Sequence, residues 1–246
     1  MKIVVLGTAG YHPNDTRDTS CFLIPELGFV LDAGTGMHRL GKLLVGDTLD
    51  IFLSHAHLDH VFGLTFLLGV GVTRSMRRIT VHGIGATLQA IDRHLYSEAL
   101  FPVRPNFNTQ AFSTDPFTVG DCRITPMPLA HPGGSIGFRF DWPEKSLAYV
   151  TDTTAHVDAD YVARIRGVDL LIHECNFRDQ DREWAVKTGH SCTSDVARVA
   201  AKAEVGRLLL THFNPIETSS DPIGIEQARA IFARTDLAFD GMTLEF

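Results

Sequence analysis

Short apolar runs separated by polar turns dominate the chain, and most of them are rich in β-branched and aromatic residues. Such runs predict strands, here over residues 2–6, 21–24, 28–31, 49–53, 79–82, 117–119, 122–127, 136–140, 146–150, 168–172, 207–210 and 242–246. Apolar residues at helical spacing predict helices over residues 37–44, 59–68, 86–95, 161–165, 193–203 and 225–232. No internal repeat or low-complexity linker interrupts this pattern, so we expect one domain over residues 1–246.

Side chains able to bind metal or transfer protons gather where the predicted strands end. The strand ends carry Ser54-His55, Thr151-Asp152, His173-Glu174 and Thr211-His212, and His131 lies in a glycine-rich turn beside another strand. Groups placed at strand ends share one edge of a sheet. The pattern therefore predicts a polar site at such an edge.

The densest group is the run Ser54-His55-Ala56-His57-Leu58-Asp59-His60, which directly follows a buried strand. His55 and His57 are two residues apart in a loop, so both rings can converge on one cation. Asp59 and His60 are adjacent at a helix start and are aimed at a second position close by. Imidazole and carboxylate are the ligands expected for zinc and similar divalent metals. The alternative is a surface histidine cluster that binds no metal.

Composition narrows the class of protein only moderately. Hydrophobic residues make up 44% of the chain and charged residues 21%, which is ordinary for a soluble globular protein. The net charge is −7, and the densest basic group is only Arg74, Arg77 and Arg78, which argues mildly against a long nucleic acid as substrate. No apolar stretch is long enough to span a membrane or to serve as a signal peptide, so we expect a cytoplasmic protein.

The four cysteines form no C-x-x-C pair and no dense framework. Reduced thiols are therefore the default expectation for Cys21, Cys122, Cys175 and Cys192. Cys175 and Cys192 flank the region around His190, and we expect packing roles for both.

The run of residues 54–60 resembles the metal-binding motif of the metallo-β-lactamase-fold hydrolases, and the resemblance extends over nearly the whole chain. It implies an α/β fold, a four-layer αββα sandwich of two mixed sheets with paired metals at one edge. It also implies the ligands. His55, His57 and His131 would hold the first metal, Asp59, His60 and His212 the second, and Asp152 would bridge the two. Asp32 would either orient one of these ligands from behind or serve only in a turn.

The implied centre suits phosphodiester hydrolysis. Two divalent cations, the carboxylates of Asp59 and Asp152 and one bridging hydroxide leave a net charge of +1, which can accept a phosphodiester monoanion. A metal-bound water with a pKa of about 7 would supply the nucleophile. Zn²⁺ is the first expectation for both metals, although Mn²⁺ and Fe²⁺ accept the same ligands.

Three further motifs resemble the ribonuclease Z-like branch of the family: Gly189-His190-Ser191, His173-Glu174-Cys175-Asn176 and Thr211-His212-Phe213-Asn214-Pro215. They make His190 the candidate for phosphate contact or general acid, with Glu174 holding its imidazole. The alternative for His190 is a solvated loop histidine. Asp59, His190 and Glu174 are the expected catalytic residues.

The separation of His131 and Asp152 bears on the substrate. Ribonuclease Z usually carries a long arm between these two positions for gripping tRNA, whereas here two strands and a tight turn fill the interval. We therefore expect a phosphodiesterase for a small or cyclic nucleotide-type substrate, and the family resemblance allows a homodimer. The alternatives are a ribonuclease Z-like tRNA 3′-processing endonuclease, a thioester or lactam hydrolase on the same scaffold, and a metal-binding module without activity.

Overall fold

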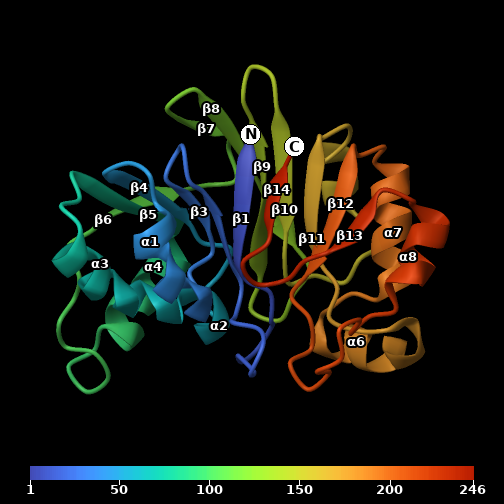
Figure 1. The fold of residues 1–246 in the computed structure, drawn as a ribbon, viewed down its shortest axis with the longest axis horizontal. Coiled ribbons are helices and arrows are strands. Elements are labelled where there is room, and N and C mark those ends of the chain that lie inside the picture. Colours follow the sequence, from blue (N-terminus) through green and yellow to red (C-terminus); the bar gives the residue numbers. More distant parts are fainter. The chain divides into compact units, whose positions relative to one another are not determined.

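Two seven-stranded mixed β-sheets organise the chain, which we describe over residues 1–246 from a computed structural model (Figure 1). The backbone divides into two compact units, each built on one of the sheets. Unit 1 comprises Met1–Ser113 and Phe239–Glu245, and unit 2 comprises Thr114–Ala238 with Phe246. The expectation of a single domain over residues 1–246 stays a prediction. The α/β class, with two mixed sheets flanked by helices, is confirmed.

The sheet of unit 1 has the strand order β14-β1-β2-β3-β4-β5-β6. Its strands are β1 (Lys2–Gly7), β2 (Cys21–Ile24), β3 (Phe29–Leu31), β4 (Thr48–Phe52), β5 (Arg78–Ile84), β6 (Asn108–Phe112) and β14 (Thr243–Glu245). The strands from β3 to β6 are parallel, and the remaining neighbours are antiparallel. Its helices are α1 (Leu40–Leu43), α2 (Leu58–Val61), α3 (Leu67–Thr73) and α4 (Gly85–Ala90). Short 3₁₀ segments at Thr35–Arg39 and Phe62–Phe66 and a π-helical turn at Ile91–Leu95 join them.

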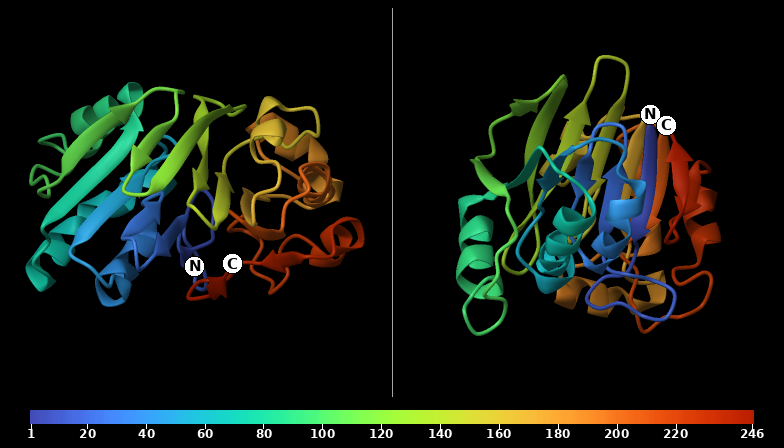
Figure 2. Two further views of the ribbon diagram at one scale, coloured as in Figure 1. Left: turned by 90° about the horizontal axis from the view of Figure 1, so that it is seen from above. Right: turned by 60° about the vertical axis from the view of Figure 1, so that its left-hand side comes forward.

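The sheet of unit 2 has the order β13-β12-β11-β10-β9-β8-β7. Its strands are β7 (Phe117–Val119), β8 (Cys122–Leu129), β9 (Ser135–Asp141), β10 (Ser146–Val150), β11 (Leu170–Glu174), β12 (Arg207–Thr211) and β13 (Thr235–Leu237). The strands from β10 to β13 are parallel, while β7, β8 and β9 form an antiparallel ribbon that can be followed in yellow-green in Figure 2. The helices are α5 (Asp160–Arg164), α6 (Arg182–Thr188), α7 (Thr193–Lys202) and α8 (Ile225–Ile231).

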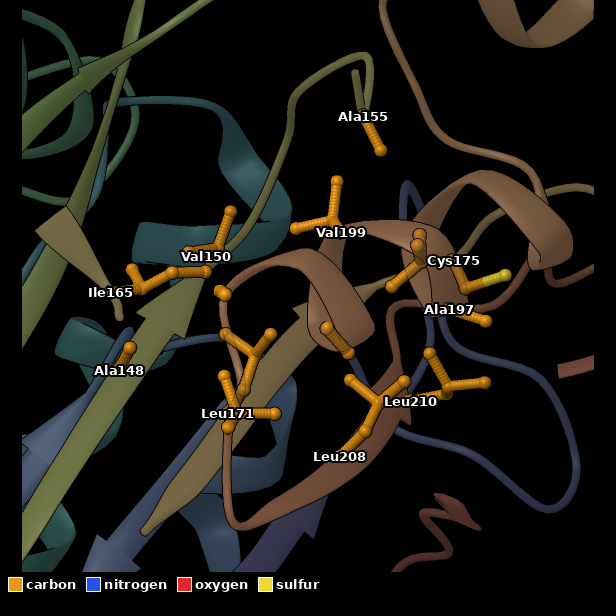
Figure 3. Close-up of a cluster of buried hydrophobic side chains, with 14 of the residues drawn as sticks. Ala148, Val150, Ala155, Ile165, Leu171, Cys175, Ala197, Val199, Leu208 and Leu210 are labelled. Atoms are coloured by element: carbon orange, nitrogen blue, oxygen red, sulfur yellow. The ribbon is translucent and has the colours of Figure 1, made fainter. Parts of the chain in front are cut away.

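Each unit buries an apolar core between its sheet and its helices. In unit 2, Leu171, Leu208 and Leu210 of the parallel strands pack with Ala197 and Val199 of α7, as Figure 3 shows. Each of these five side chains is fully buried. In unit 1, alternate residues of β1 to β5 pack against α1, α3 and the 3₁₀ segments in the same way. These cores fix the strand ends that carry the candidate site.

The elements that the sequence pattern did not predict are β6, β13 and α6. β6 and β13 are the outer strands of their sheets, and four of the five residues of β6 are exposed, so apolar alternation is absent there. In α6, Ala185 is the buried residue, which leaves no apolar stripe to recognise. The helix predicted over residues 59–68 is broken into α2, a 3₁₀ segment and the start of α3.

Candidate metal centre

The histidine-rich run of unit 1 lies where β4 gives way to α2, and its side chains are gathered closely. The ring of His55 has its centroid 4.3 Å from that of His57 and 4.4 Å from that of His60. The Nε2 atom of His60 is 3.3 Å from Oδ2 of Asp59. Asp59 Oδ2 also accepts a 2.8 Å hydrogen bond from the backbone N–H of Tyr11, which fixes the outer side of this carboxylate. Unit 1 therefore presents three imidazoles and one carboxylate together.

Asp32 orients two of these rings through one chain of hydrogen bonds. Its Oδ1 accepts the backbone N–H of Ser54, and its Oδ2 accepts both the Ser54 hydroxyl and Nδ1–H of His60, each at 2.8 Å. The same Ser54 oxygen lies 2.9 Å from Nδ1 of His55 and can accept its proton. With Nδ1 protonated in His55 and His60, the lone pair of each ring is on Nε2. Of the two roles expected for Asp32, the structure supports ligand orientation.

In unit 2, two histidines approach the two oxygens of one aspartate. The Nε2 atom of His131 is 3.3 Å from Oδ2 of Asp152, and Nε2 of His212 is 3.1 Å from Oδ1. His131 follows β8, Asp152 follows β10 and His212 follows β12, and all three side chains are buried. Nδ1 of His131 donates to the carbonyl of Gly189 over 3.0 Å, which again directs Nε2 towards the carboxylate. A carboxylate faced by one imidazole on each oxygen is suited to bridging two cations.

His190 stands beside this group, on the turn that follows α6. Its ring centroid is 5.1 Å from that of His131 and 5.3 Å from that of His212. Its Nδ1 is 3.1 Å from Oε1 of Glu174, so the pairing expected from the sequence is present. The side chain of His190 is 16% exposed and that of Glu174 is fully buried, so the imidazole is open to solvent on one side and held by a carboxylate on the other. Candidate ligand atoms of Asp152, His190 and His212 also lie within 4.8 Å of one another, which adds His190 to the possible metal donors.

Glu174 is itself fixed by the backbone around it. It accepts hydrogen bonds from the N–H groups of Thr153 at 3.0 Å, Asn176 at 3.2 Å and Ser191 at 3.3 Å. Three backbone donors and one imidazole thus surround a carboxylate that has no access to water, so charge-assisted hydrogen bonds hold it in one orientation. This carboxylate in turn holds the imidazole of His190 in position.

His173, next to Glu174 in the chain, has a structural role. Its Nδ1–H donates to the carbonyl of Glu174 at 2.7 Å, and its Nε2 is 3.0 Å from the hydroxyl of Tyr161. Burial lowers the pKa of the His173 imidazole, which is therefore neutral with both nitrogens bonded. The four cysteines are buried and form no disulfide. Burial raises the pKa of Cys192 to about 12, and it raises that of Cys175 well above its ordinary value, as expected for packing residues.

Backbone strain is concentrated at these strand ends. Non-glycine residues with positive φ include Asp32 at 56°, Asp152 at 47° and His212 at 59°, each in the first positions beyond a strand. Such conformations cost about 1 kcal/mol or more and persist where the surroundings demand them. The strand-end polar residues are thus held in position by the sheets, which is the arrangement that a preformed ligand set requires.

The donors fit a divalent metal. Imidazole and carboxylate suit zinc and related cations, and in His55, His60 and His131 a protein acceptor faces Nδ1, which leaves the lone pair of Nε2 available to a metal. Of the donors in the two units, the sequence predicted all but His190 as ligands. It gave no role to Ser54, which links Asp32 to His55, or to Asn176, which donates to the carbonyl of His212 at 2.9 Å. Both are short polar residues beside a ligand, and only their contacts distinguish them from other turn residues.

Comparisons with known proteins identify the family. Residues 29–213 match the family model described as the β-lactamase superfamily domain. The chain is 30% identical to a ribonuclease Z from Nostoc sp. over an alignment of 308 residues. This alignment covers 100% of this chain and 95% of that relative. The chain belongs to the metallo-β-lactamase-fold hydrolases, in their ribonuclease Z-like branch. Its membership of this superfamily makes it a metal-dependent hydrolase, as the sequence predicted.

Solved structures of this superfamily show the same fold over the full chain. The metallo-β-lactamase-fold protein YhfI from Bacillus subtilis has a TM-score of 0.79 at 24% identity, covering 100% of this chain and 99% of that one. The short form of human tRNase Z has a TM-score of 0.79 at 23% identity, with the same coverage. At these identities the likeness establishes the metallo-β-lactamase fold, and the fold prediction is confirmed. None of the helices has the length and hydrophobicity that a membrane span requires.

Proposed function

We propose that this hydrolase is a binuclear phosphodiesterase that acts on a small or cyclic nucleotide-type phosphodiester. The proposal assigns His55, His57 and His131 to one metal, Asp59, His60 and His212 to the other, and Asp152 to the bridge. Zn²⁺ is the proposed metal, with Mn²⁺ and Fe²⁺ accepted by the same donors. When bound, such a metal pair supplies Lewis acidity and an activated water. Family membership and the donor geometry within each unit support this assignment.

The observation that carries the proposal is the pairing of His190 with buried Glu174 beside Asp152 and His212. Hydrolysis adds water across one P–O bond: the water oxygen joins phosphorus, and the departing alkoxide takes a proton. Glu174 stabilises the doubly protonated imidazole of His190, whose Nε2 proton can pass to that alkoxide. A thiolate leaves without being protonated, so thioester hydrolysis gives a carboxylate-held histidine no comparable role, and similarity to a ribonuclease Z favours the phosphodiester over a lactam.

The first test is metal content by elemental analysis beside hydrolysis of bis(p-nitrophenyl) phosphate, a chromogenic β-lactam and a thioester. The proposal expects close to two metals per chain and turnover of the phosphodiester alone. Turnover of only the lactam or the thioester would assign the alternative reaction class. Failure to bind metal on reconstitution would refute the binuclear centre.

The role of His190 is tested by the acidity of the leaving group. His190→Ala should retain metal and lose about 10²–10⁴-fold in turnover of a diester with an alkyl leaving group, the range of general acid catalysis. A p-nitrophenyl leaving group needs little protonation, so His190→Ala should lose much less turnover on a p-nitrophenyl diester. His156→Ala, which removes an exposed loop histidine of the same unit, should leave both rates unchanged. Equal losses on both substrates would contradict a proton-donating role.

A ribonuclease Z-like tRNA 3′-processing endonuclease is the second candidate, favoured by the 30% identity to the Nostoc relative. Two observations favour a smaller substrate. Only β9, a tight turn and β10 separate His131 from Asp152. The alignment of 308 residues contains all 246 residues of this chain, which leaves 62 aligned positions of the relative without a counterpart. Efficient cleavage of precursor tRNA at the mature 3′ end would overturn the smaller-substrate proposal.

A further inference from the structure

Unit 2 contains a small polar cavity next to its candidate catalytic residues. The cavity has a volume of about 170 Å³ and lies between two loops, residues 175–181 after β11 and residues 213–222 after β12. Because β11 and β12 are parallel neighbours, both loops leave the same edge of the sheet. Ligands of open α/β sheets bind at this edge, beyond the carboxyl ends of the strands. The loops begin directly after Glu174 and close to His212, so the cavity adjoins the site.

We propose that this cavity is a subsite for the neutral nucleoside part of the substrate. The inference rests on the proposed phosphodiesterase function and adds to it a class of substrate and the residues that select it. Pockets for drug-sized ligands span about 300–1,000 Å³, so a cavity of this size suits one ring system rather than a whole nucleotide chain. Asn176, Phe177, Gln180, Asn214, Ile216 and Glu217 contribute to its lining.

The lining has the chemistry that base and sugar edges require. Asn176 is committed to the protein, because its Nδ2 donates to the carbonyl of His212. Asn214 accepts the N–H of Ile216 on Oδ1 at 3.1 Å, and no protein acceptor takes its Nδ2–H groups. The amide of Gln180 makes no hydrogen bond within the protein. Asn and Gln amides pair with nucleobase edges through matched donors and acceptors, so Gln180 and Asn214 can each hydrogen-bond to a base.

Apolar surface is available on the same cavity. The ring of Phe177 has its centroid 6.4 Å from that of His190, so it connects the cavity with the proposed general acid. Ile216 is 80% exposed, so its apolar side chain is available to a ligand in the cavity that it lines. Unstacked bases are commonly bound by an aromatic face together with hydrogen bonds to their edges. The combination of Phe177, Ile216 and two available amides matches that mode of recognition.

The charges around the cavity disfavour a second phosphate. Arg178 is engaged by the carbonyls of Asp221 at 2.8 Å and Pro222 at 3.0 Å, and its guanidinium is 3.8 Å from Glu217. Asp181 adds a second carboxylate to the lining, so one cation faces two anions. A phosphate attached to the bound nucleoside would meet this negative charge, whereas the neutral nucleoside would not. The cavity therefore selects a terminal nucleoside and discriminates against continued polynucleotide.

The inference is tested with three diesters: bis(p-nitrophenyl) phosphate, thymidine 5′-(p-nitrophenyl phosphate) and the latter compound with an added 3′-phosphate. We expect kcat/KM to be highest for the simple thymidine ester and to fall when the 3′-phosphate is present. The double variant Gln180→Ala/Asn214→Ala should raise KM for the thymidine ester about tenfold or more, with kcat and the rate on bis(p-nitrophenyl) phosphate unchanged. An unchanged KM for the thymidine ester would overturn the subsite.

Removing the two carboxylates of the cavity tests the electrostatic selection. Asp181→Asn/Glu217→Gln should relax discrimination against the 3′-phosphate by about three- to tenfold, the effect of removing charges near the protein surface. Glu226→Gln, on the exposed face of α8, is the matched control and should change nothing. Equal discrimination in the double variant and the control would overturn the electrostatic selection.

Binding of thymidine alone, followed by ligand-observed NMR on the metal-free protein, separates this inference from the proposed function. Wild-type protein should bind thymidine, and Gln180→Ala/Asn214→Ala should not. Hydrolysis of bis(p-nitrophenyl) phosphate without thymidine binding would leave the phosphodiesterase standing and refute the subsite. Thymidine binding without any diester hydrolysis would support the cavity as a nucleoside site and refute the proposed reaction.

Discussion

Replacing Asp32 by asparagine should impair metal binding without removing a single ligand. Asparagine has the shape of aspartate but only one accepting oxygen. The backbone N–H of Ser54 cannot turn away, so the remaining oxygen must stay at the Oδ1 position, 2.8 Å from it. The NH₂ group then occupies the Oδ2 position, which in the wild type accepts from the Ser54 hydroxyl and from Nδ1–H of His60.

This exchange of an acceptor for a donor propagates to two histidines. His60 must give up its Nδ1 proton to accept from the new NH₂ group, and its remaining proton then sits on Nε2. The Ser54 hydroxyl, which now accepts from the same NH₂ group, turns its proton towards Nδ1 of His55, and that ring also becomes the Nε2–H tautomer. An imidazole protonated on Nε2 cannot bind a metal through that atom. One substitution therefore disables one proposed ligand at each metal.

The expected loss of metal affinity can be taken from other proteins in which a residue that orients a metal ligand was replaced. Loss of such a partner typically costs 10–100-fold in metal affinity, which is about 1.4–2.7 kcal/mol. In Asp32→Asn we expect a loss of affinity of this size for each of the two proposed metals. The unfolding free energy of the metal-free protein should fall by about 1–3 kcal/mol, because several buried hydrogen bonds to a charged acceptor become neutral ones.

The assay is competition for metal with a chromophoric chelator, combined with ¹⁵N NMR of the histidine rings to read the tautomers. Asp50→Asn is the matched control, since Asp50 is also a buried aspartate beside a histidine, with its Oδ1 2.8 Å from Nε2 of His82 and Arg78 bound to both oxygens. It should lose stability and keep wild-type metal affinity. Wild-type affinity in Asp32→Asn, or an equal loss in both variants, would refute the tautomer argument.

Two further predictions concern unit 2. Asp152→Ala should lower metal content and diester turnover together, measured by elemental analysis and by hydrolysis of bis(p-nitrophenyl) phosphate. The control Asp169→Ala removes a carboxylate bound to Ser146 and should keep the wild-type metal content and turnover. Near-normal metal content in Asp152→Ala would contradict the proposal that Asp152 bridges two metals. Burial lowers the folded-state pKa of His173, so its contribution to stability is present above the unfolded value of about 6.5 and is lost as the pH falls towards the folded value. Urea unfolding of metal-free protein should show up to about 1.4 kcal/mol per pH unit of extra slope below pH 6.5 relative to His173→Gln, and identical slopes would show that His173 does not titrate in this way.

Much of the fold was predictable because the buried strands are continuous apolar runs. The strand at 146–150 was predicted with the bounds that β10 has, and the strands predicted over residues 21–24 and 28–31 are present as β2 and β3. Parallel strands buried on both faces produce such runs, whereas the outer strands β6 and β13 carry no comparable signal.

The candidate site was predictable to the extent that its residues follow strands. His55, Asp152 and His212 each lie just beyond an apolar run, and a resemblance to a known motif assigned the rest. What the sequence did not reveal is the order of hydrogen bonds, such as the path from His55 through Ser54 to Asp32. That path depends on rotamers and on distances between residues far apart in the chain, which a pattern of residue types does not encode.

The turn before His190 determines which parts of this enzyme can be varied by directed evolution. Gly189 has φ of 77°, and a Cβ there would lie 2.4 Å from Cδ of Pro132 and 3.1 Å from Nδ1 of His131. Any side chain at position 189 would therefore clash with Pro132 and crowd the ring of His131, a proposed metal ligand, so a library at this position should yield few active clones. Gln180 and Glu217 line the cavity of unit 2 and lie outside this turn. Substrate preference can consequently be diversified around the cavity of unit 2 while the turn that couples His190 to His131 is left untouched.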